Sequence, residues 1–269
     1  MRFVTYDAGS GPRAGFIRGG ERVIDVGDSL RELIAAGPLR EPADGEDLAL
    51  SDVRLLPPIP DPDKIICIGL NYRSHAEEAG VEAPETPTFF AKFRNALVPA
   101  GTEVKLPAAS RKVDYEAEVA FVVGRRAKDV SEAEALDHIA GYTLLNDLSA
   151  RDLQFATPQW LPGKVFDGSA PCGPALVTPD EAGAPDAIGI ELKLNGEVMQ
   201  SATTADLIHS IPTLLAHLST LMTLAPGDIV STGTPSGVGS VREPRVWLKA
   251  GDEIEINSPS LGTLRTTLS

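Results

Sequence analysis

Apolar and polar positions alternate through much of the chain, which is the pattern of half-buried strands rather than of helices. The segment 113–123 (VDYEAEVAFVV) carries an apolar residue at every odd position. A second run alternates on both sides of Asn195-Gly196, the pair that suits a type I′ hairpin turn. Short β-branched or aromatic runs bounded by Gly or Pro occur at 64–69 and 89–93. These patterns predict a body built mainly of strands.

Helical signals are few and short. A capping box at 131–134 precedes an apolar pair and a closing glycine, and Ser210 precedes an apolar stripe with helical spacing. A further short helix is expected after a cap at Asn71 or Ser74, and it is ended by Gly80. Because strands outnumber helices and no regular βαβ rhythm occurs, we predict an α+β fold that is mostly β.

A proline-rich stretch, LLPPIPDPDK, interrupts the chain at residues 55–64. Its four prolines favour a stiff, extended connector over a helix or a central strand. Before it lie a strand-like start and one short helix capped by Asp28 or Ser29. We therefore predict a small N-terminal accessory domain over residues 1–56 and a main body over residues 57–269.

The chain has 38 acidic and 24 basic side chains, which give a formal net charge of −14. This balance argues against nucleic acid and anionic membrane surfaces as partners, because the long-range field repels both. No apolar run approaches the ~20 residues of a membrane span, and no secretory signal is visible. Cys67 and Cys172 lie outside any CxxC motif, as expected of reduced, buried cysteines in the cytoplasm. An anionic substrate would need a locally positive pocket.

The even positions of segment 113–123 carry the first candidate chemistry. Asp114, Glu116 and Glu118 share one face of the expected strand, and that face turns apolar at Ala120, as expected where a strand enters a cleft. Carboxylates two residues apart point to the same side, where a cation relieves their repulsion. Oxygen ligands favour Mg²⁺ or Mn²⁺ over zinc. By itself, however, this spacing is more common on a solvated strand face than in a metal site.

Other candidate groups have two readings each. Asp147 ends an apolar run, where it is either a third oxygen ligand or part of an Asx turn. His75 and Glu78 lie three residues apart on one helical face, as in a carboxylate-oriented base or in an exposed pair. Lys164 is a lone cation in a loop. The glycine-rich loop 232–240 lacks the GK[ST] ending of a phosphate loop, but its backbone N–H groups suit a carboxylate.

Six blocks of sequence together resemble one family. They are NYRSHAEEAG, DYEAEVAFVVGRR, GYTLLNDLSARDLQ, QWLPGKVFDGSAPCGPALVT, LNGEVMQ and LAPGDIVSTGTPSGVG. Their order and spacing over roughly residues 64–269 resemble the fumarylacetoacetate hydrolase superfamily. QWLPGK and REPRVWLKAGDE are most similar to the branch of fumarylacetoacetate-hydrolase-domain proteins and 2-hydroxyhepta-2,4-diene-1,7-dioate isomerases. The resemblance implies a mixed β-sandwich roll, usually a homodimer, with a small leading domain as in several bacterial members.

The resemblance also implies a metal-dependent enzyme. Its expected Mg²⁺ ligands are Glu116, Glu118 and Asp147, with Mn²⁺ as the alternative metal, and His75 with Glu78 resembles the water-activating pair. The expected reaction is acylpyruvate-type hydrolysis of a C–C bond through a metal-bound enolate. The alternatives are decarboxylation or tautomerisation of oxaloacetate, or isomerisation of 2-hydroxyhepta-2,4-diene-1,7-dioate. A non-catalytic protein that binds 2-oxo acids is a further alternative.

Four more residues match substrate-facing positions of the family. Arg151 and Gln154 match groups that face the substrate, Thr234 the group that binds a substrate carboxylate, and Lys164 the lysine that stabilises enolate charge. One departure from the pattern concerns the metal. The eponymous enzyme carries an additional metal-binding aspartate shortly before its histidine, whereas residues 65–74 contain no carboxylate. This departure favours a substrate smaller than fumarylacetoacetate.

Overall fold

The computed structural model describes residues 1–269, and a 12-stranded mixed sheet runs through most of it. Its strand order is β4-β3-β2-β1-β14-β12-β11-β17-β6-β7, with β5 beside β1 and β8 beside β14. The strands are β1 (Arg2–Asp7), β2 (Pro12–Arg18), β3 (Arg22–Gly27), β4 (Asp47–Ala49), β5 (Arg54–Leu56), β6 (Ile65–Gly69), β7 (Thr88–Lys92), β8 (Leu97–Pro99), β11 (Ala117–Val123), β12 (Ile139–Asn146), β14 (Ala170–Val177) and β17 (Ile229–Ser231).

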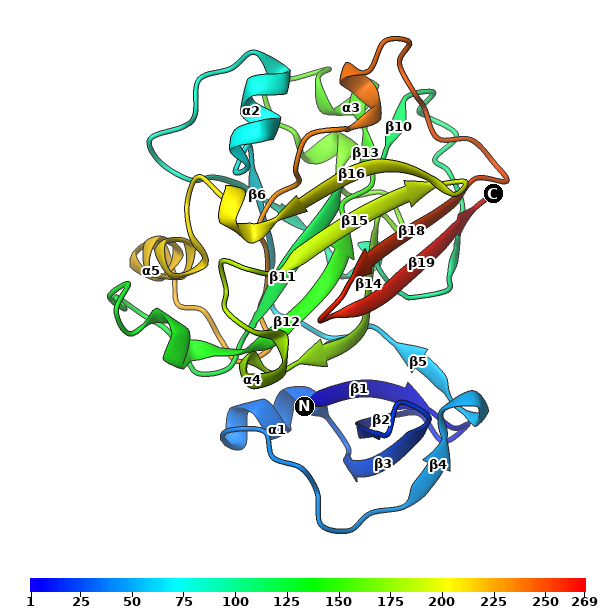
Figure 1. Cartoon of the computed structure of the whole chain (residues 1–269), viewed down its shortest axis with the longest axis vertical. Coiled ribbons are helices and arrows are strands. Elements are labelled where there is room, and N and C mark those ends of the chain that lie inside the picture. Colours follow the sequence, from blue (N-terminus) through cyan, green and yellow to red (C-terminus); the bar gives the residue numbers. More distant parts are fainter.

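A second sheet has five strands in the order β16-β15-β18-β19-β9, and β10 pairs with β13 separately. These strands are β9 (Glu103–Val104), β10 (Val113–Asp114), β13 (Ser149–Ala150), β15 (Gly189–Leu194), β16 (Glu197–Thr203), β18 (Glu253–Ser258) and β19 (Gly262–Leu268). In Figure 1 the second sheet lies in front of β11 and β12. The predicted fold class, mostly β with mixed sheets, is confirmed.

Helices are short and lie around the sheets. The α-helices are α1 (Leu30–Ala36), α2 (Arg73–Ala79), α3 (Arg151–Gln154), α4 (Pro179–Ala182) and α5 (Ile211–Leu221). The 3₁₀ turns are η1 (Leu50–Asp52), η2 (Arg94–Ala96), η3 (Ala135–His138), η4 (Leu161–Gly163), η5 (Thr204–Asp206) and η6 (Gly239–Val241). None of the helices has the length and apolar character that a membrane crossing requires.

Several predicted caps and turns are present. Ser29 accepts a hydrogen bond from the N–H of Glu32 at the start of α1, and Ser210 accepts one from Thr213 at the start of α5. Gly80 ends α2 in the left-handed conformation at φ 64°. The Asn195-Gly196 turn joins β15 to β16 as predicted.

Two local predictions are wrong. The segment after 131–134 forms only the turn η3, because Leu136 is exposed and Ile139 already begins β12. Neither predicted cap of α2 caps it. The Asn71 amide instead bonds the carbonyls of His209 and Thr232, and Ser74 donates to Asp206. Both side chains therefore tie α2 to distant loops, which local sequence does not reveal.

Strand β11 is central and is buried on both faces. Val119 and Phe121 belong to the largest core cluster, whereas Ala120 and Val122 belong to a second cluster on the opposite face. This arrangement explains why the acidic face of segment 113–123 turns apolar. The segment is not one strand, however: β10 ends at Asp114 and β11 begins at Ala117, so Glu116 lies in the break.

The N-terminal segment adds strands to the large sheet. Arg2 and Phe3 of β1 pair with Val177 and Leu176 of β14. Phe3 also packs in the second core cluster with the even face of β11. In Figure 1 this segment lies at the end of the molecule opposite α2 and α3. The boundary after residue 56 falls at the end of β5, where the connector to β6 begins, and an independently folding domain over 1–56 stays a prediction.

Candidate active site

Three buried carboxylates meet where β11 begins and β12 ends. The antiparallel register pairs Ala117 with Asn146, which brings the residues just outside these two strand ends together. The N–H of Asp147 donates to the carbonyl of Glu116 at 2.9 Å. One carboxylate oxygen each of Glu116, Glu118 and Asp147 lies within 4.8 Å of the others, and all three side chains are buried. The structure thus brings together the three carboxylates that the resemblance singles out.

Three buried cations surround these carboxylates. Lys164 Nζ lies 2.6 Å from Glu116 Oε2 and 2.7 Å from Asp147 Oδ2. Arg151 donates to Glu116 Oε1 at 2.6 Å. Lys92 Nζ lies 2.5 Å from Asp147 Oδ1, and its side chain is fully buried. Buried cations therefore neutralise most of the negative charge at the site.

A fourth carboxylate, Asp114, holds Arg151 from the other side. Its Oδ2 accepts from Arg151 Nε at 2.9 Å, and it also accepts from the backbone N–H groups of Gly239 and Ser240. We call these seven groups the charge cluster. It comprises Asp114, Glu116, Glu118, Asp147, Lys92, Arg151 and Lys164.

The pKa values follow from these contacts. Burial alone would raise the pKa of Glu116, but the charges of Arg151 and Lys164 outweigh burial and hold it well below its usual range. Burial likewise opposes the charged form of Lys164, yet Asp147 and Glu116 raise its pKa. Glu118 forms no ion pair, so burial, followed by repulsion from Asp147 and Glu116, raises its pKa to about 8.

The charge cluster suits a hard divalent cation. Four carboxylates face three cations, so one negative charge is uncompensated when all four carboxylates are ionised. Glu118 would carry that charge, because its carboxyl group interacts only with the Ser231 hydroxyl at 2.5 Å and the Gly233 N–H at 3.1 Å. Its raised pKa keeps it protonated near neutral pH unless a cation binds. The donor set is entirely oxygen, which is the set preferred by Mg²⁺ and Mn²⁺. Glu116, Glu118 and Asp147 are the residues that would hold such an ion.

A cavity of about 310 Å³ opens onto this cluster. Eight of the nine candidate residues line it: His75, Glu116, Glu118, Asp147, Arg151, Gln154, Lys164 and Thr234. The ninth, Glu78, acts behind His75. Its carboxylate lies 3.4 Å from His75 Nδ1 and accepts from the N–H of Gly237 at 2.9 and 3.0 Å. Glu78 thereby ties α2 to the glycine-rich loop and orients the imidazole.

Thr234 faces the cavity, but its hydroxyl is committed to the protein. The hydroxyl donates to the carbonyl of Ala117 at 3.0 Å and accepts from Gln200 Nε2 at 2.8 Å. The backbone N–H of Thr234 makes no hydrogen bond within the protein. This N–H group, rather than the hydroxyl, is therefore free to bind a carboxylate.

Two members of the charge cluster, Lys92 and Asp114, could not be assigned a role from the sequence pattern. Lys92 sits in a short strand whose pattern gives no sign that its ammonium is buried. Asp114 shares the acidic face of its segment with Glu116 and Glu118, but its spacing alone does not reveal that it holds Arg151. One signal was available for Asp114: it belongs to the same D-x-E-x-E run as the two glutamates.

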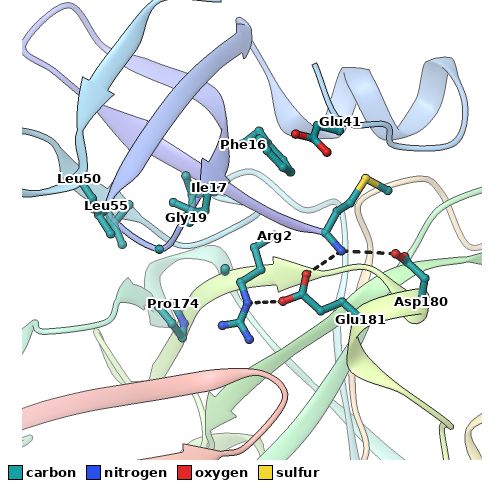
Figure 2. Close-up of a pocket in the computed structure, with 14 residues that line it drawn as sticks. Arg2, Phe16, Ile17, Gly19, Glu41, Leu50, Leu55, Pro174, Asp180 and Glu181 are labelled. Atoms are coloured by element: carbon teal, nitrogen blue, oxygen red, sulfur yellow. Dashed lines mark hydrogen bonds and ion pairs between the residues drawn. The ribbon is translucent and has the colours of Figure 1, made fainter. Parts of the chain in front are cut away.

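A larger hollow of about 740 Å³ lies elsewhere, between the N-terminal strands and the main body. Figure 2 shows Phe16, Ile17 and Leu55 facing Pro174 and Glu181 across it. Its charged groups are partly exposed and paired with each other, as between Arg2 Nε and Glu181 at 2.6 Å. It holds no cluster of metal-ligating side chains, so the smaller cavity is the candidate active site.

Comparison with protein families supports the same assignment. Residues 64–269 match the model described as "Fumarylacetoacetate (FAA) hydrolase C-terminal", and residues 1–58 match "Rv2993c-like, N-terminal". The chain belongs to the fumarylacetoacetate hydrolase family. It is an enzyme of this family, as the resemblance in its sequence motifs implied.

Individual relatives are similar over most of their length. Oxaloacetate tautomerase fahd2 of Xenopus laevis, described as mitochondrial, is 44% identical over 219 residues, which are 81% of this chain and 69% of that protein. The fumarylacetoacetate hydrolase structure from Exiguobacterium antarcticum has a TM-score of 0.89 and 33% identity, covering 100% of this chain and 99% of that one. A 5-carboxymethyl-2-hydroxymuconate delta-isomerase structure from Mycobacterium smegmatis has a TM-score of 0.85 and 35% identity, with the same coverage.

Proposed function

We propose that the enzyme uses a divalent metal, Mg²⁺ or Mn²⁺, to form an enolate from a small 2-oxo acid. The observation that carries this proposal is the buried oxygen triad of Glu116, Glu118 and Asp147 beside Lys164. When bound, the metal supplies Lewis-acid polarisation of the 2-oxo carbonyl and neutralises the excess carboxylate charge. All other contributions come from side chains and backbone groups of the chain itself.

Lys164 stabilises the developing negative charge. Two of its three ammonium protons are held by Glu116 and Asp147, which leaves one to donate to the enolate oxygen. The two carboxylates fix the ammonium in place before the reaction, so little reorganisation is needed as charge develops. Arg151 has two N–H donors beyond those bound to Asp114, Glu116 and Gln154, and its side chain lines the same cavity.

His75 is the group that moves the proton. Glu78 faces Nδ1, so the neutral ring presents Nε2 as the acceptor. In tautomerisation, His75 takes a proton from carbon 3 of the keto acid, and the resulting imidazolium returns a proton to the enolate oxygen, which gives the enol and restores the neutral imidazole. In hydrolysis of a 2,4-dioxo acid, His75 takes a proton from water, hydroxide adds to the distal carbonyl, and the C–C bond breaks to release the enolate of pyruvate and a carboxylic acid.

Each reaction has its own support. The names of the relatives favour tautomerisation of oxaloacetate, since several are oxaloacetate tautomerases. Hydrolysis is favoured by the apolar lining of the outer cavity, which suits an acyl group. The assay is to follow pyruvate release and enol–keto conversion with acetylpyruvate and oxaloacetate, in Mg²⁺ and in EDTA. Full activity in EDTA on every substrate would refute the proposal, because no other group takes the metal's place.

Two further predictions from the sequence belong to this proposal. The family resemblance implies a homodimer, which light scattering after gel filtration tests directly. A cytoplasmic location also stays a prediction, and fractionation of the source cells would test it.

A further inference from the structure

Three exposed apolar side chains meet at the mouth of the active-site cavity. They are Val81 after α2, Phe155 after α3 and Val241 in η6. Their exposed fractions are 44%, 67% and 38%, and they are three of only eight large apolar side chains exposed on the whole chain. Segments far apart in the sequence thus converge to make one apolar rim. We use this term for Val81, Phe155 and Val241.

The rim lies where the far end of a substrate would emerge. Under the proposed function, the carboxylate and 2-oxo group lie near the triad, Lys164 and the Thr234 N–H at the inner end of the cavity. The group beyond carbon 3 then points along the wall formed by Ala79 and Trp160 towards the rim. An apolar group there would remove both its own surface and the rim's from water.

The Lys and Arg residues that line the cavity, Lys164 and Arg151, belong to the charge cluster at its inner end, so their spare N–H donors serve the 2-oxo group rather than a second substrate carboxylate near the rim. Arg151, Lys164 and Lys92 are each bound to at least one carboxylate of the protein. With a divalent metal, the cluster carries one net positive charge, which a single carboxylate neutralises. A second substrate carboxylate would add an unpaired negative charge in a partly buried site. His75 could pair with it only in competition with Glu78, whose carboxylate already faces His75 Nδ1.

We propose that the apolar rim is a distal subsite that selects 2-oxo acids with an apolar far end over dicarboxylic ones. The inference rests on the proposed function, because it places the 2-oxo group at the triad. It goes further by naming the substrate class and the three residues that determine it. It also predicts that oxaloacetate, the substrate in the names of several relatives, is not the preferred substrate of this enzyme.

The first test compares substrates on the Mg²⁺-loaded wild type. Acetyl-, butanoyl- and hexanoylpyruvate and oxaloacetate are assayed for both pyruvate release and enol–keto conversion. We expect kcat/KM to rise about two- to fourfold for each added methylene, and oxaloacetate to be the poorest substrate. No dependence on chain length, or a preference for oxaloacetate, would overturn the inference alone. No turnover of any of these acids, together with no Mg²⁺-dependent binding of oxalate, would instead overturn the proposed function.

The second test changes the rim. Phe155→Ala should flatten the chain-length dependence while sparing oxaloacetate, and Leu221→Ala, at a similarly exposed position on α5, should leave both unchanged. Val241→Lys should raise the kcat/KM for oxaloacetate relative to hexanoylpyruvate by about tenfold, whereas Val198→Lys on β16 should not. A uniform loss on all substrates in Phe155→Ala would overturn the inference and indicate that the rim acts only in covering the cavity.

Discussion

The active-site cavity and the hollow beside the N-terminal strands are both lined by charged groups, and they differ in how that charge is balanced. At the active site the charge cluster is buried, and four carboxylates face three cations. At the N-terminal hollow, Arg2, Glu181 and Asp180 are partly exposed and water shares in their solvation (Figure 2). Unbalanced charge is tolerable in water but costly when buried, unless a ligand completes it. The smaller hollow is therefore the one built to receive a cation and an anion.

The largest contrast between the two hollows should come from neutralising one glutamate in each. Glu116→Gln removes an anionic ligand and loosens Lys164 and Arg151 while keeping the shape of the side chain. We expect turnover to fall by about 10²-fold or more, and the affinity for Mn²⁺, measured by electron paramagnetic resonance, to fall with it. Glu181→Gln at the N-terminal hollow should change neither quantity. Normal Mn²⁺ affinity in Glu116→Gln would contradict the metal assignment.

His75→Ala tests which chemistry the active site performs. Loss of a general base typically lowers the rate by about 10²–10⁴-fold, so we expect this loss for acylpyruvate hydrolysis and for tautomerisation. Decarboxylation of oxaloacetate needs the metal and the Lys164 cation but no base, and it should survive His75→Ala better than Lys164→Ala. His138→Ala, at a partly exposed histidine in η3 that does not line the active-site cavity, is the control. Assays of pyruvate and of the enol in parallel distinguish the outcomes.

Lys92→Met compares a buried cation with an exposed one. Its removal leaves Asp147 Oδ1 without its cation, and breaking a buried pair typically costs about 3–5 kcal/mol in the free energy of unfolding. Arg2→Met at the N-terminal hollow should cost less than about 1 kcal/mol, because partly exposed pairs contribute little. Urea denaturation of both variants in EDTA measures the difference. If both variants lost the same free energy of unfolding, burial of the charge cluster would not increase its contribution to stability.

The smallest expected effect is that Glu118 and Glu181 make the folding stability depend on pH in opposite directions. The folded-state pKa of Glu118 is raised to about 8 from an ordinary 4.5, so its stabilising contribution is present below about 4.5 and is lost as pH rises towards 8. Burial opposes the charge of Glu181, but the N-terminal amine and Arg2 lower its pKa. Its contribution is therefore present above the ordinary value and is lost as pH falls.

Thermal denaturation in EDTA between pH 5 and 8 measures the Glu118 contribution. Glu118→Gln should flatten the fall in stability over that range, and Glu181→Gln should not. Saturating Mg²⁺ should also flatten it, because a bound cation favours the ionised carboxylate. A wild type whose stability rises with pH in EDTA, with the same slope in Glu118→Gln, would contradict the raised pKa.

Much of the local structure could be predicted from the sequence, because it depends on neighbours along the chain. The turn at Asn195-Gly196 and the Ser210 cap of α5 both follow from the conformations and hydrogen bonds that these residue types favour. The failed helix after 131–134 had a local cap, but its apolar residues had no core to pack against. Capping alone does not stabilise a helix without tertiary packing.

Some residues of the candidate site could likewise be predicted from the sequence, and others could not. Sequence motifs pointed to Glu116, Glu118 and Asp147, and the structure brings them within 4.8 Å of one another. Only the tertiary structure disclosed Lys92, which lies on β7, four strands along the sheet order from β12, and far in sequence from its partner Asp147 just after β12. The apolar rim likewise comes from three separate segments. Periodicity and motifs record which face a residue takes and which chemistry it carries. The balance of buried charge depends on which distant segments meet, and only the packing of the sheets decides that.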